Sequence, residues 1–170
     1  MPTVQDGLQD TPPFAGHSPS KERPLGGYGL LLGSYCLAVG TFAGWLRRSG
    51  RELPEQLTTR DLALIAVANH KLSRIIARDR VTSVLRAPFT RFQGDAGPGE
   101  VDEAARGHGL RRAIGELVIC PYCIGMWTAT GLTAGYVVAP RATRFVASVF
   151  TAVAAADVLQ IAYARAESAL

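Results

Sequence analysis

Long stretches without charged side chains alternate with basic segments along this chain. Residues 25–46 and 117–140 hold 22 and 24 residues without a charge, and 145–164 is a third apolar run, interrupted only by Asp157. A helix that spans a bilayer needs about 20 predominantly apolar residues, so each stretch is long enough. The transmembrane helices that this pattern predicts lie at about 26–46, 117–139 and 145–164.

Residues 61–78, DLALIAVANHKLSRIIAR, form a further helical candidate. The first half is apolar on all sides, whereas the second half carries Lys71 and Arg74. Such a helix either crosses the bilayer with its basic end reaching water, or lies in the interface as an amphipathic helix. Thr58 or Thr59 is suited to cap it. Counted as a span, this segment completes an all-α membrane bundle of four transmembrane helices.

The remaining segments are polar. Residues 1–25 contain five prolines together with Gly, Ser and Asp, which predicts a disordered N-terminal tail. Residues 79–112 are rich in Gly and Arg, and Ala87-Pro88 should end any helix there. We therefore predict a flexible basic loop over 79–112. The predicted organisation is a tail at 1–25, an additional transmembrane helix at 26–46, and a membrane domain at 62–164 that contains the loop.

The basic residues lie mainly beside or between the apolar runs, and the formal net charge is +4. Basic segments in these positions are typical of cytoplasmic loops of membrane proteins, and they can contact anionic lipid headgroups. Nucleic acid is not an expected partner, because the basic residues are scattered without interleaved aromatics. Four spans predict a multipass protein of the cell membrane with both termini in the cytoplasm. If 61–78 lies in the interface instead, the N-terminus is outside.

Small residues recur along the first predicted helix. Gly29 and Gly33 form one GxxxG pair, and Gly40 and Gly44 form a second, offset by 11 residues. This offset is about three helical turns, so the two pairs share a face. Small residues let helices approach closely in lipid, which makes this face a candidate contact for a second copy or another membrane protein. An apolar run can also produce such a pattern by composition alone.

The stretch 115–127, GELVICPYCIGMW, carries the most chemically suggestive pair, Cys120 and Cys123. The letters CPYC match the dithiol of glutaredoxins, but no βαβ pattern surrounds them. A thiol redox switch at the entrance of a membrane helix is one alternative. A zinc site is another, although structural zinc usually takes four Cys or His ligands. The third reading is structural, and no cofactor is predicted.

Asp157 lies well inside the last apolar run. An acid at membrane depth is a candidate functional residue, and the alternative is a structural partner for an Arg or a hydroxyl in the bundle. The sequence contains no Ser-His-Asp set, phosphate loop, HExxH motif or dinucleotide fingerprint. We therefore predict no catalytic residues and do not expect an enzyme.

Residues 74–127 also combine several short motifs: an Arg-rich helix end, Asp-Arg, Arg-Ala-Pro-Phe, and Gly-Glu-Leu followed by CxxCxGxW. The motif residues are Arg74, Asp79, Arg80, Arg86, Pro88, Phe89, Gly115, Glu116, Cys120, Cys123, Gly125 and Trp127. This combination resembles a bacterial family, domain of unknown function family 1360, which includes a sporulation-associated membrane protein. The resemblance covers roughly 62–164 and implies a small integral membrane protein without a known activity.

Two expectations follow from these observations together. Glu116 should pair with an Arg of the Arg-Ala-Pro-Phe segment and so anchor the loop to the bundle. The protein should be an uncharacterised multipass membrane protein with a structural or partner-binding role. The alternative is a membrane-embedded CxxC redox switch or zinc-binding protein.

Overall fold

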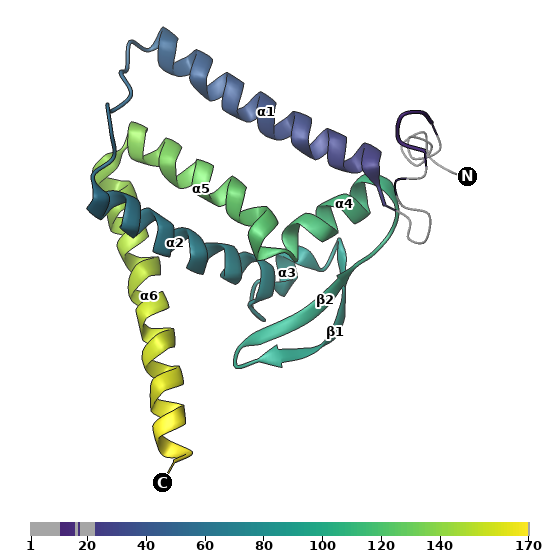
Figure 1. Cartoon of the computed structure of the whole chain (residues 1–170), viewed down its shortest axis with the longest axis vertical. Helices are drawn as coiled ribbons and strands as arrows, with labels where there is room; N and C mark the ends of the chain where they lie inside the picture. Colours follow the sequence, from purple (N-terminus) through teal and green to yellow (C-terminus); the bar gives the residue numbers. More distant parts are fainter. Residues whose placement is uncertain (1–10, 16, 18–22, 170) are drawn as a thin grey trace. The chain divides into compact units, whose positions relative to one another are not determined.

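The computed structural model describes residues 11–15, 17 and 23–169 (Figure 1). These residues divide into two compact units. Unit 1 contains the chain up to Arg51 together with Ile76–Ile124, and unit 2 contains Glu52–Ile75 and Gly125–Leu170. Most of the predicted disordered tail, 1–25, lies outside the described residues.

Unit 1 contains a β-hairpin beside its helices, so the all-α prediction is incomplete. Its elements are α1 (Leu25–Arg48), α3 (Ser83–Arg86), β1 (Thr90–Gly97), β2 (Glu100–Ala105) and α4 (Gly109–Val118). The strands are antiparallel, and their register runs from Thr90 opposite Ala105 to Gly97 opposite Glu100. Pro98 and Gly99 form the two-residue connection. The segment 79–112, predicted as a loop, therefore has regular structure over much of its length, and its flexibility stays a prediction.

The chain before the hairpin crosses it and is bonded to both of its ends. Near the turn, the Arg80 N–H donates to the Gly99 carbonyl at 2.9 Å. At the open end, the Arg106 N–H donates to the Phe89 carbonyl, also at 2.9 Å. Between these points α3 ends at Arg86, with Ala87 as its C-cap, as the Ala87-Pro88 pair predicts.

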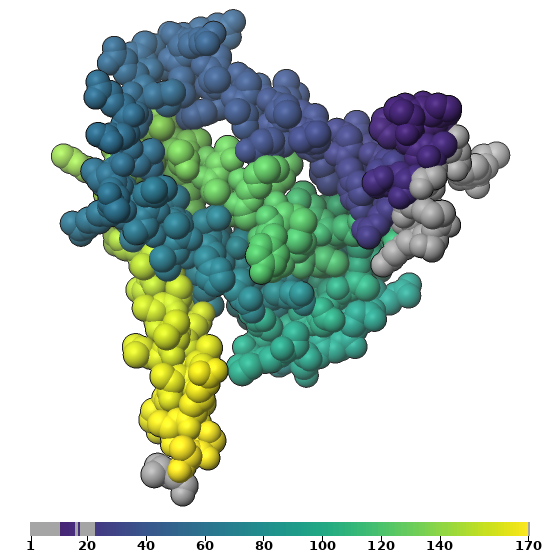
Figure 2. All heavy atoms as spheres, viewed as in Figure 1, coloured from purple at the N-terminus to yellow at the C-terminus, as the bar shows by residue number. Residues whose placement is uncertain are grey.

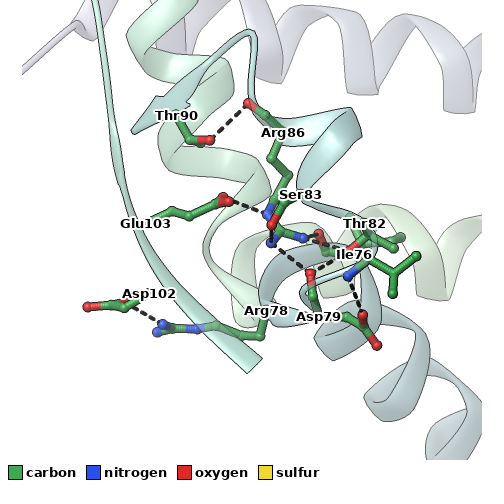
Figure 3. A network of polar contacts seen from close by, with 10 residues as sticks. Ile76, Arg78, Asp79, Thr82, Ser83, Arg86, Thr90, Asp102 and Glu103 are labelled. Carbon is green, nitrogen blue, oxygen red and sulfur yellow. Dashed lines mark hydrogen bonds and ion pairs between the residues drawn. The ribbon is translucent and has the colours of Figure 1, made fainter. Parts of the chain in front are cut away.

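Arg86 lies at the centre of this arrangement and is only 1% exposed (Figure 3). Its guanidinium has five N–H donors, and the structure gives each of them an acceptor. Nε donates to the Glu103 carboxylate at 2.7 Å. The other acceptors are the carbonyls of Ile76 and Asp79 and the hydroxyls of Thr82 and Ser83, at 2.6–3.0 Å. One side chain thus joins the end of α2, α3 and the hairpin.

Glu103 is as enclosed as its partner, with a side chain that is 5% exposed. Burial by itself raises the pKa of Glu103, but hydrogen bonds from Arg86, Ser83 and Thr90 bring this pKa below its ordinary value of 4.5. A carboxyl with a lowered pKa stabilises the folded state fully above the pKa of the unfolded chain. This contribution is lost as the pH falls through the lower, folded-state pKa.

Unit 2 is a group of three helices around a small apolar core. The helices are α2 (Thr59–Arg78), α5 (Pro121–Val138) and α6 (Pro140–Glu167). The last turn of α2 and the first turn of α5 belong to unit 1. Their core residues are Ile65, Ala68, Leu132 and Ala147. Thr58 caps α2, as predicted, because its Oγ1 accepts the Asp61 N–H at 3.1 Å.

Buried polar contacts supplement that core. Asp61 is 4% exposed, and its carboxylate accepts two hydrogen bonds from the Arg144 guanidinium, each at 2.8 Å. The Tyr136 hydroxyl donates to the same carboxylate at 2.7 Å. Arg144 lies in α6, which begins at Pro140. The carboxylate of α2 in this way bonds to both other helices of the unit.

By length and composition, α1 and α6 qualify as membrane spans among the described residues, and α4 with α5 qualifies as a third if the bent pair counts as one. The four predicted spans are not confirmed, because α2 carries too many charged residues and α5 alone is rich in Gly, Thr and Tyr. Residues 158–167 of α6, yellow in Figure 2, are exposed throughout. The long apolar helices therefore present most of their side chains outwards.

We expect Arg86→Met to destabilise the protein by about 3–5 kcal/mol, because it leaves the Glu103 carboxylate buried without its cation. Thermal unfolding in detergent measures the change. Arg80→Met is the matched control, since Arg80 and its partner Asp95 are 59% and 69% exposed. Exposed ion pairs contribute about 0–1 kcal/mol to the free energy of unfolding. Equal unfolding midpoints for the two variants would contradict a central role for Arg86.

Candidate functional site

The stretch 115–127 forms the junction between α4 and α5 rather than the start of one long helix. α4 ends at Val118, α5 begins at Pro121, and the helix axis turns by 80° between them. Proline has no N–H, so Pro121 cannot continue the hydrogen bonding of α4. The same residue suits the first position of a new helix. The predicted helix at 117–139 is therefore wrong at its N-terminal end.

Cys120 caps α5. Its Sγ accepts the backbone N–H of Cys123 at 3.2 Å, the contact that a serine or aspartate makes at a helix N-cap. The Cys120 carbonyl also accepts the N–H groups of Cys123 and Ile124, both at 3.0 Å. The CxxC spacing therefore places Cys120 at the N-cap and Cys123 at the third position of one helix. There the Cys120 thiol satisfies the backbone N–H of Cys123.

Both thiols are free, and Cys123 is exposed. In the part of the chain that the structure describes, no three His, Cys, Asp or Glu side chains gather in a way that could hold a metal ion. A zinc site using this pair would need ligands other than those that the described residues bring together. Zinc binding and a redox role for the pair stay predictions.

Gly115 allows α4 to lie against the hairpin. A Cβ built on Gly115 would be 2.5 Å from the Phe89 carbonyl oxygen and 2.9 Å from the Ala105 Cβ. Real Cβ atoms do not approach this closely, so a larger residue would force the backbones apart. Gly115 and Phe89, two of the motif residues, therefore meet in the fold.

Glu116 joins α4 to α1. Its carboxylate accepts a hydrogen bond from the Tyr28 hydroxyl and pairs with Arg112 one turn earlier at 3.1 Å. The predicted pairing of Glu116 with Arg86 is wrong, because Arg86 is committed to Glu103. Figure 1 shows the first turns of α1 beside α4.

Gly27 brings these two helices close together. A Cβ built there would lie 2.7 Å from the Ala113 Cβ. The glycines of the two predicted GxxxG pairs make no such close contact. A Cβ built on Gly29, Gly33, Gly40 or Gly44 would have no described atom of another element within 4 Å. Their predicted role in partner binding remains a prediction.

The other motif residues have structural contacts. The Asp79 carboxylate accepts the Val81 N–H at 2.8 Å, and Arg80 pairs with Asp95 at 2.8 Å. The Pro88 carbonyl accepts hydrogen bonds from Arg106 and Arg111.

In unit 2, Gly125 lies against Ser73 of α2, with its Cβ position 3.8 Å from the Ser73 Cβ. Arg74 and Trp127 lie on α2 and α5. The motif residues are therefore spread over both units.

Asp157 pairs with Lys71 of α2 at 2.5 Å. The partner is a lysine rather than the Arg or hydroxyl suggested by the sequence. Glu103, Tyr28 and Gly27 were not identified from the sequence. Only Glu103 had a usable signal, because Pro98-Gly99 marks a two-residue turn and so places Glu103 in a strand that pairs back on the chain.

The fold thus defines a mainly helical protein with long apolar helices, a small β-hairpin and one fully buried ion pair. The family described as "Protein of unknown function (DUF1360)" matches residues 64–163, so the chain belongs to this family and the predicted resemblance is confirmed. A relative is "Sporulation protein YjcA" of Bacillus subtilis (strain 168), 32% identical over 87 residues, which are 49% of this chain and 74% of the relative. No solved structure matches the chain.

We expect Gly115→Ala to destabilise the protein by about 1–3 kcal/mol, since the added methyl group meets the backbone of Phe89 and the Cβ of Ala105. Gly131→Ala is the control, because no described atom lies within 4 Å of the added group. The midpoints of thermal unfolding in detergent provide the comparison. A Gly115→Ala midpoint as high as that of the control would show that α4 does not need this close approach.

The capping role of Cys120 predicts different effects for two substitutions. Cys120→Ala removes the acceptor and should cost about 0.5–2 kcal/mol, whereas Cys120→Ser keeps an oxygen acceptor and should be close to wild type. Cys123→Ser is the control on the neighbouring thiol. Thermal unfolding with parallel zinc analysis tests this expectation. A Ser variant as unstable as the Ala variant, together with loss of bound zinc, would instead favour a metal site.

Proposed function

We propose that this protein is a multipass integral membrane protein of the bacterial cell membrane, with a structural or partner-binding role and no catalytic activity. The observation that carries the proposal is the exposure of large apolar side chains along α1 and α6. Leu37 is 71% exposed and Leu159 is 70% exposed, and both lie in helices long enough to span a bilayer. Contiguous apolar surface of this extent is unfavourable in water and is expected where lipid covers the helix.

The contacts of α2 support its inclusion as a fourth span. The charged residues of α2 prevent it from qualifying as a membrane span by composition alone. A charge at membrane depth is nevertheless tolerated when it is paired within the bundle. Asp61 pairs with Arg144, and Lys71 pairs with Asp157. Both partners belong to α6, so each of these two charges of α2 has an opposite charge beside it on another helix of the unit. α5, with 18 residues, is about 27 Å long, close to the thickness of the hydrocarbon core.

The proposed topology crosses the bilayer with α1, α2, α5 and α6. This topology places both termini and the hairpin in the cytoplasm, and the linker between α1 and α2 outside. The basic residues of the hairpin segment then lie on the cytoplasmic side, in keeping with the positive-inside bias. The relative from Bacillus subtilis, named as a sporulation protein, supports a bacterial setting.

Two measurements test this proposal. The protein should stay in the membrane fraction after an alkaline carbonate wash and should dissolve only in detergent. Recovery in the washed supernatant would overturn membrane integration.

Single cysteines in a cysteine-free background test the topology, because a maleimide that does not cross membranes labels only outward-facing thiols in intact cells. Three exposed residues provide the positions: Glu55 in the linker between α1 and α2, Gln93 in the hairpin, and Glu167 at the end of α6. We expect Glu55→Cys to be labelled in intact cells, and Gln93→Cys and Glu167→Cys only after lysis. Labelling of both Glu55→Cys and Gln93→Cys but not Glu167→Cys would indicate that only α1 and α6 cross. Labelling of all three positions, or of none, would indicate three spans.

A further inference from the structure

Two guanidinium groups in unit 1 converge on a single neutral oxygen. Arg106 donates from Nε and Nη2 to the Pro88 carbonyl, each at 3.3 Å. Arg111 donates from the same two nitrogens to the same oxygen, at 2.9 and 2.7 Å. A carbonyl oxygen has two lone pairs, so four N–H groups exceed its accepting capacity. Two positive charges are thus held together with no negative charge between them.

The carboxylates of unit 1 that the structure describes do not pair with these two arginines. Four of them have other arginine partners: Asp95 with Arg80, Asp102 with Arg78, Glu103 with Arg86, and Glu116 with Arg112. Among the residues that the structure describes, neither Arg106 nor Arg111 has a carboxylate partner. Each guanidinium uses two of its five N–H groups on Pro88, so three remain for another acceptor.

The backbone holds both side chains in place. The Arg106 N–H is bonded to the Phe89 carbonyl at 2.9 Å, which positions the Arg106 Cα at the open end of the hairpin. Gly107 has a φ of +84°, and a Cβ built on it would lie 2.9 Å from the Arg111 Cδ. The aliphatic part of Arg111 therefore lies across Gly107, where an added Cβ would displace it. Arg111 is also in the first turn of α4, where the helix dipole adds positive potential.

A third arginine lies on the same face of the hairpin. Arg91 is opposite Ala104 in the register, and cross-strand partners point to the same side of a sheet. Alternate residues share a face, so Arg106, two residues after Ala104, continues the face of Arg91. In the described part of the chain, the Arg91 side chain has no hydrogen-bond or ion-pair partner. The basic surface thus extends from the converging pair along one face of the hairpin.

We propose that Arg106 and Arg111 form a binding site for a phosphate group, with Arg91 at its edge. Guanidinium groups bind phosphate oxygens with two parallel N–H groups, and an anion here would separate two charges that now share one carbonyl. The phosphate belongs either to an anionic phospholipid headgroup or to free inorganic phosphate. All three arginines lie in unit 1, so the site does not depend on which helices cross the membrane.

Thermal unfolding of the full-length protein in detergent tests the site, followed by the fluorescence of Trp45 and Trp127. One arm adds inorganic phosphate against chloride at equal ionic strength. The other adds phosphatidylglycerol against phosphatidylcholine in mixed micelles. We expect one arm or both to raise the midpoint of the wild type by about 4 °C or more. A rise with phosphatidylglycerol alone identifies the headgroup, and a rise with inorganic phosphate identifies a free ion.

The double variant Arg106→Gln/Arg111→Gln should lose most of this rise. Arg47→Gln/Arg48→Gln is the matched control, because it removes the same charge from exposed residues of the same unit. Arg106→Lys/Arg111→Lys keeps the charge without the paired N–H geometry and should retain only part of the rise, which gives a test if the Gln variant does not fold. No rise in the wild type with either addition overturns the site, as does an equal loss in the Arg47/Arg48 control.

Discussion

The buried pair of Arg86 and Glu103 is the constraint on which unit 1 depends. A guanidinium that is removed from water is tolerated only where its N–H groups find acceptors, and here all five do. Those acceptors come from the end of α2, from residues 79–82, from α3 and from β2. Each of these segments is too short or too polar to bury much apolar surface of its own. The polar cluster therefore takes the place of a hydrophobic core in this unit.

Local rules predicted the features of the chain that have local causes. Thr58 at the start of α2 and Ala87-Pro88 at the end of α3 could be identified without knowledge of the fold, because a cap and a proline act on their immediate neighbours. The apolar runs likewise located α1 and α6. Hydrophobicity does not report the direction of a helix axis, however. The break before Pro121 therefore lay hidden inside an uncharged stretch.

The hairpin and its contacts could not be predicted in this way. The hairpin segment is rich in glycine (Gly94, Gly97 and Gly99), which is typical of a loop. Its regular structure is supported by arginines that lie before it in the chain. Glu103 is held by Arg86, and Asp102 is held by Arg78. Pairing across such distances is decided by geometry that appears only when the chain is folded. The same reason explains the incorrect pairing of Glu116, whose partners Tyr28 and Arg112 fit its position on α4.

The bonds at both ends of β2 limit where this segment can change in length. β2 is held beside its first residue by the bond from Arg80 to Gly99, and beyond its last by the bond from Arg106 to Phe89. A residue inserted between these points would reverse the alternation of the strand and turn Glu103 away from Arg86. β1 has eight residues against six in β2 and already accommodates the difference as irregularities after Phe92 and Asp95. Insertions in related sequences should therefore accumulate in the first strand and be rare in the second.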